Sequence, residues 1–159
     1  MKNLKLKAVR IQELATVVDA IPLKDLLTAK DIRLASSIVK DLLAAIPDLA
    51  AASSTFDTKK VEIFKANNYV QRYNEESALL ATQEEKEALA KKIDQEFNAV
   101  IAKELVAEAE AVKTQCEPMI EAELGDEKFA KLKEVFEKFA HDMYRSKEAY
   151  LEVADALEL

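Results

Sequence analysis

Residues able to do chemistry are scarce in this chain. Cys116 is its only cysteine and His141 its only histidine, so one chain cannot assemble a structural zinc cluster. Glu137 precedes His141 by one helical turn, and no second such pair exists for a di-iron bundle. Cys116 and His141 could meet across helices as a minimal thiol-activating pair. The alternative, a small half-buried cysteine and a surface histidine, is the one we favour, so we expect no catalytic residue, no metal site and no enzyme activity.

Carboxylates are the most abundant of the remaining chemical groups. The pairs Glu108/Glu110 and Glu121/Glu123 have the residue type of an acid and a base. In so acidic a helical chain, however, such pairs indicate a solvated face. A single glycine excludes a Gly-rich phosphate-binding loop. We therefore expect no cofactor.

Helices are the elements that must position these residues. Half of the 159 residues are hydrophobic, and the chain holds only one glycine and three prolines. This composition predicts an almost all-helical protein, and the length predicts a single domain over residues 1–159.

Charge is unevenly distributed along the chain. The net charge is −7, yet residues 1–46 carry eight basic and five acidic side chains, against fifteen and twenty-five in residues 47–159. The acidic balance disfavours duplex nucleic acid, whose binding requires basic groups. No segment approaches the roughly eighteen apolar residues of a membrane span, and the start lacks the apolar run of a signal peptide. We expect neither a nucleic acid nor a membrane partner.

The longest helical pattern runs from Thr82 to about Thr114. Thr82 and Glu85 form a capping-box pair, and no glycine or proline occurs between Thr82 and Pro118. About thirty residues would form a helix about 45 Å long, so other helices or another chain must pack along it. We therefore expect an all-α antiparallel bundle of about five helices around this long central helix.

Shorter patterns complete the expected architecture. Residues 4–9 alternate between apolar and basic side chains, which fits a short strand or the frayed start of a helix. No clear second strand is present, so a partner strand would come from near Cys116–Ile120 or from another protein. Residues 48–56 favour a loop. Helices are expected at 11–21, ended by Pro22; at 28–46, capped by Thr28 and ended by Pro47; at 57–81, weakened at Asn67–Asn68; and at 126–143, after Gly125. Helical spacing continues to Leu157, either without interruption or after a break near Arg145–Ser146.

The opening and the ending of the chain resemble a known group of proteins. The opening runs from Leu4-Lys5-Leu6 through Ile21-Pro22-Leu23-Lys24 to the helix after Thr28, and the ending from Tyr150-Leu151 to Leu157-Glu158. Both are similar to small helical proteins that tailed bacteriophages encode near their tail-module genes. Asp25 stands where such proteins tend to have a glycine. The resemblance implies a viral protein located in the host cytoplasm or within a virion.

Two functions are compatible with these observations. The first is a non-enzymatic phage protein that acts through helix-mediated contacts with a protein partner or with itself, as a virion component or an assembly accessory. Its candidate contact residues are Leu4, Lys5, Leu6 and Lys7. The alternative is an acidic inhibitor of a host or defence protein, in which Glu104, Glu108 and Glu121 imitate phosphates and binding weakens as salt rises.

Overall fold

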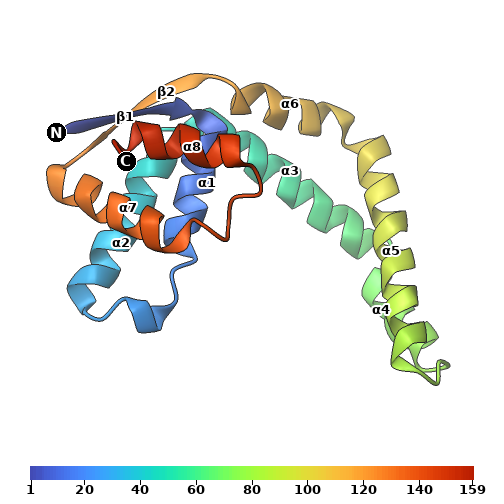
Figure 1. Ribbon diagram of the computed structural model, residues 1–159. Coiled ribbons are helices and arrows are strands. Elements are labelled where there is room, and N and C mark those ends of the chain that lie inside the picture. Colours follow the sequence, from blue (N-terminus) through green and yellow to red (C-terminus); the bar gives the residue numbers. More distant parts are fainter. The chain divides into compact units, whose positions relative to one another are not determined.

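The computed structural model describes residues 1–159 and is built almost entirely from helices (Figure 1). The expected all-α fold with a short N-terminal strand is confirmed. The elements run in the order β1 (Lys2–Lys7), α1 (Ala8–Asp19), a 3₁₀ helix (Leu23–Asp25), α2 (Ala29–Ala44), α3 (Pro47–Ala66), α4 (Tyr69–Ser77), α5 (Gln83–Glu104), α6 (Val106–Cys116), β2 (Met119–Leu124), α7 (Asp126–Phe139) and α8 (Lys147–Ala156).

The chain divides into two compact units. The terminal unit comprises Met1–Ala50 and Thr114–Leu159, and the middle unit comprises Ala51–Lys113. The boundaries between the units lie within α3 and α6. That residues 1–159 form one domain stays a prediction. No helix combines the length and the apolar composition that a bilayer crossing requires.

The terminal unit contains a two-stranded antiparallel sheet (Figure 1). Leu4 pairs with Ala122 and Lys5 with Glu121. Because side chains alternate along a strand, Leu4 and Ala122 are buried on one face, while Lys5 and Glu121 lie on the other. Of the two alternatives for residues 4–9, the strand is correct for residues 4–7, whereas residues 8 and 9 begin α1. β2 of the same chain supplies the partner strand.

The core of the terminal unit is organised around α1. This helix contacts β1, α2, α7 and α8, and Figure 1 shows it enclosed by the other helices of the unit. Its Ile11 and Leu14 side chains are fully buried, as are Leu132 and Phe136 of α7. We had expected the segment after Thr82 to be the packing centre, and in this unit the short α1 has that role.

Several helix ends in the terminal unit follow local signals in the sequence. The Thr28 hydroxyl accepts a hydrogen bond from the Asp31 amide at 3.1 Å, as expected of an N-cap. Pro47 follows α2 and is also the first residue of α3, where its fixed φ suits a helix start. The loop expected at residues 48–56 is wrong, because α3 begins at Pro47 and continues through this segment to Ala66.

The middle unit contains most of α3, together with α4, α5 and most of α6. The capping box at Thr82 is confirmed, since the Thr82 hydroxyl accepts from the Glu85 amide and the Glu85 carboxylate accepts from the Thr82 amide. The helix does not continue to Thr114, however. It ends at Glu104, and α6 begins at Val106 after one non-helical residue, Leu105, which is buried.

Polar contacts stabilise the helix start that follows Leu105. The carboxylate of Glu108, in the first turn of α6, is bonded by Lys59 of α3 and by its own backbone amide. An acidic group in this position satisfies an amide that the helix leaves free and interacts favourably with the helix dipole. A new helix start is thus stabilised where neither glycine nor proline marks one.

Candidate functional site

The residues first considered for catalysis do not form an activated pair. Cys116 is the last residue of α6 and is half-buried. Burial raises the pKa of its thiol, and Glu117 and Glu13 raise it further. Reactive cysteines require the opposite shift, because the thiolate is the nucleophile. The His141 ring instead lies edge-on to the Tyr150 ring, with 6.0 Å between centroids.

Metal ligands are not grouped in this fold. No set of three or more His, Cys, Asp or Glu side chains is placed to hold an ion. Several carboxylates of the chain form ion pairs with its own lysines and arginines, as in the pair between Lys128 and Asp41.

The strand residues considered for partner binding have two different environments. Leu4 and Leu6 are buried in the core of the terminal unit. Lys5 and Lys7 are directed to the other face, where their ammonium nitrogens lie 3.7 Å from Glu121 and 3.8 Å from Glu117. Leu4 and Leu6 thus contribute to the folded core, and a binding role for the strand stays a prediction.

The three glutamates of the inhibitor hypothesis lie on separate elements. Glu104 is the exposed last residue of α5, Glu108 is in α6, and Glu121 is in β2 of the terminal unit. Glu108 is ion-paired with Lys59 and Glu121 with Lys5. These pairs reduce the negative charge that two of the three carboxylates can offer to a basic partner, and the inhibitor role stays a prediction.

An aromatic cluster in the middle unit is the most distinctive surface feature. Phe64 of α3, Tyr69 of α4 and Phe97 of α5 contact one another, with ring centroids 5.3 to 5.6 Å apart. The arrangement is edge-to-face or tilted, as aromatic pairs prefer. Only Tyr69 of the three is buried. The cluster holds three helices together and still presents apolar surface.

Hollows in the surface flank this aromatic cluster. One, of about 450 Å³, is lined by Phe64, Tyr69 and Val70 among others. A second, of about 310 Å³, is lined by Val61, Phe64 and Phe97 with two charged residues. Phe64 lines both hollows, so the apolar side chains of the two adjoin the same ring. We call this surface, defined by Val61, Phe64, Tyr69, Val70 and Phe97, the aromatic patch.

Two ion pairs brace the helices that carry the patch. Arg72 of α4 bonds both carboxylate oxygens of Glu96 on α5, and Lys59 of α3 bonds Glu108 of α6. The hydrogen bond from Arg72 lowers the pKa of Glu96, and that from Lys59 lowers the pKa of Glu108. Both pairs therefore favour the charged carboxylates. They fix α3 to α6 and α4 to α5 without covering the aromatic patch.

Sequence reasoning placed the members of the patch only in part. Val61, Phe64, Tyr69 and Phe97 are apolar positions of the helices expected at 57–81 and after Thr82, and helical spacing predicts that they face inward. Phe64 and Phe97 are partly exposed because few side chains of the middle unit pack over them, and spacing within one helix does not reveal this.

No protein-family description, curated protein or solved structure matches the chain.

Proposed function

We propose that this chain is a non-enzymatic, phage-type protein that works through helix-mediated protein–protein contacts, as a virion component or an assembly accessory. The middle unit carries the contact surface, and its first partner is a second copy of the chain. The observation that supports this most is the distribution of burial. Only Tyr69, Ile93 and Leu105 of the middle unit are buried hydrophobic residues, and all others belong to the terminal unit.

With so few buried side chains, the middle unit leaves much of the apolar surface of its helices uncovered. An amphipathic helix must bury its apolar stripe against another element. In the middle unit Val61 is 50% exposed and Val70 58% exposed, and both adjoin the aromatic rings. Burial of apolar area contributes about 25 cal/mol per Å², so covering the aromatic patch with another helix is favourable.

The charges on α5 favour a second copy as the occupant. Exposed Glu84, Glu85 and Glu87 begin this helix, and exposed Lys91 and Lys92 follow one turn later. In a two-fold symmetric contact each surface meets its own copy in the reverse direction. The acidic end of one α5 then faces the lysines of the other, so the same sequence is complementary to itself.

Charge insertion into the patch tests this proposal. Val61→Glu combined with Val70→Glu places two unpaired carboxylates at the contact, where burial is costly. The matched control is Leu27→Glu combined with Leu151→Glu, because these leucines are also exposed but belong to the terminal unit. Sedimentation velocity over a concentration series should show self-association of the wild type and the control. The patch variant should associate at least about tenfold more weakly, equivalent to about 1.4 kcal/mol.

Equal behaviour of the two variants would contradict the patch as the contact surface. Wild-type protein that sediments as a monomer throughout the series would contradict self-association. Circular dichroism of both variants confirms that each retains its helices.

A further inference from the structure

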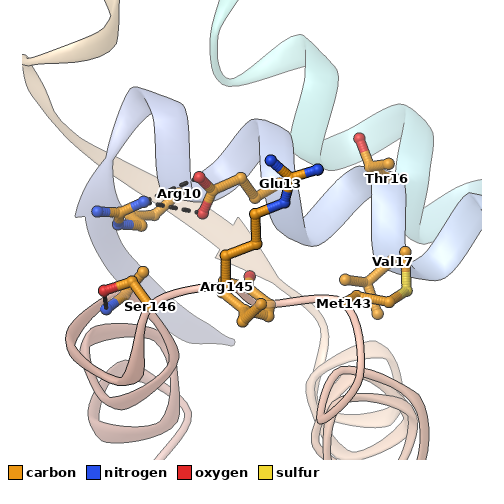
Figure 2. A pocket seen from close by; sticks show the side chains of 9 residues that line it. Arg10, Glu13, Thr16, Val17, Met143, Arg145 and Ser146 are labelled. Atoms are coloured by element: carbon orange, nitrogen blue, oxygen red, sulfur yellow. Dashed lines mark hydrogen bonds and ion pairs between the residues drawn. The ribbon is translucent and has the colours of Figure 1, made fainter.

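A second feature of interest lies in the terminal unit, apart from the aromatic patch. A cavity of about 320 Å³ opens between α1 and the segment that connects α7 to α8 (Figure 2). This volume is at the lower end of the range of small-molecule pockets, roughly 300–1,000 Å³. The cavity has an apolar wall formed by Val17, Met143 and Ala149 and a polar side that includes Glu13, Arg145 and Tyr144.

Arg145 lines this cavity and forms no ion pair with a carboxylate of the chain. Arg10, which lines the same cavity, bonds Glu13 at 2.8 Å and Glu152 at 2.9 Å. Arg145 has no ion pair or hydrogen bond to its guanidinium group, and Figure 2 shows it extending from the connecting segment toward α1. Its planar set of donors is suited to a carboxylate, which it can bind through two parallel hydrogen bonds.

Tyr144 contributes a donor without a partner. Its hydroxyl oxygen is fully buried and forms no hydrogen bond within the protein. Burial raises the pKa of this hydroxyl, and Glu13 raises it further while Arg10 lowers it, so the group stays protonated at neutral pH. A buried donor without a partner is destabilising, and an acceptor atom of a ligand would remove this cost.

We propose that this cavity binds a small organic molecule that carries one carboxylate. The carboxylate accepts hydrogen bonds from Arg145 and Tyr144, and the apolar part of the molecule lies against Val17, Met143 and Ala149. A monoanion fits better than a dianion, because Arg10 is already paired with Glu13 and Glu152. Arg145 alone is free to hold the carboxylate of a ligand.

Benzoate and its neutral analogue benzamide are suitable probes. The two share a ring and a planar head group and differ in charge. Isothermal titration calorimetry on the full chain should detect benzoate with a Kd of about 1 mM, and benzamide should bind at least about tenfold more weakly. Equal binding of the two, or no heat from benzoate at concentrations well above that Kd, would overturn the proposal.

Two variants locate the binding. Arg145→Gln should weaken benzoate by about tenfold or more, because hydrogen bonds to charged groups are the stronger ones. Tyr144→Phe should weaken it by a smaller factor without lowering the melting temperature of the free protein, since no internal hydrogen bond is lost. Arg33→Gln and Tyr73→Phe are the matched controls: Arg33 is exposed, and neither residue lines this cavity. Loss of binding in the controls, or unchanged binding in both test variants, would overturn the assignment.

Discussion

Arg72 on α4 holds Glu96 on α5 by donating to both of its carboxylate oxygens. The second of these bonds, from Nη2, measures 3.2 Å. The same guanidinium lies 3.4 Å from Glu76 through its Nε atom. Arg72 therefore adds a polar contact between α4 and α5 to the aromatic contact of Tyr69 with Phe97.

This pair predicts that the middle unit loses stability in acid. The pKa of Glu96 is lowered in the folded state, first by the hydrogen bond from Arg72. The unfolded chain then binds a proton more readily than the folded one, so the stabilisation is present above the ordinary value of 4.5 and is lost as the pH falls below it. Glu96→Gln should make the melting temperature less dependent on pH below 4.5, as measured by circular dichroism. Glu62→Gln, at an exposed position of α3 without an ion pair, is the control and should retain the wild-type dependence.

The capping box at Thr82 makes a separate prediction. Thr82→Ala removes the acceptor for the Glu85 amide, and loss of such a cap costs about 1 kcal/mol. Urea denaturation followed by helical signal should show this loss. Thr58→Ala, within α3, is the matched control and should change stability by no more than about 0.5 kcal/mol. Equal effects at the two positions would show that the box does not stabilise α5.

Neighbouring residues of β1 should differ sharply in their importance for folding. Leu4→Ala removes a fully buried side chain of the terminal unit and should cost about 2–5 kcal/mol. Lys5→Ala removes an exposed ion pair with Glu121, which is worth about 0–1 kcal/mol. The measurement is the free energy of unfolding in urea. Similar small effects of both substitutions would contradict the placement of Leu4 in the core.

Local signals in the sequence were sufficient for much of the helical fold. The capping residues Thr28 and Thr82 and the prolines Pro22 and Pro47 act on neighbouring backbone groups, so their effects can be deduced without knowing the tertiary structure. Gly125 likewise immediately precedes α7, as expected. The apolar stripe of that helix, which includes Leu132 and Phe136, is buried as its spacing predicts.

Features that depend on distant residues were predicted only in part. The sequence offered the segment near Cys116–Ile120 or another protein as the source of a strand to pair with β1, and gave no clear strand pattern over β2 itself. The helix start after Leu105 is stabilised by Glu108 and by Lys59, which is forty-nine residues away from Glu108. The Asn68 residue between α3 and α4 adopts a left-handed conformation with φ of 50°. Poor helix propensity at Asn67–Asn68 indicated weakness there, but not this turn.

The aromatic patch and the cavity beside Arg145 also combine features that the local sequence predicts with features that depend on distant residues. Helical spacing identified the apolar residues of the aromatic patch other than Val70. Their contacts join three helices, and their exposure depends on how little packs over them. The cavity beside Arg145 combines α1 with a segment more than a hundred residues later in the chain. Neither arrangement has a signal in the local sequence.

Light scattering after size exclusion, at low and at high salt, tests the proposed function most directly. Burial of the apolar aromatic patch does not depend on ionic strength, whereas contacts between exposed charges are screened within about 10 Å at 0.1 M salt. The account predicts a dimer or larger assembly of the full chain at both salt concentrations. A strict monomer in both conditions would contradict it, and an assembly that dissociates at high salt would contradict the apolar patch as its basis.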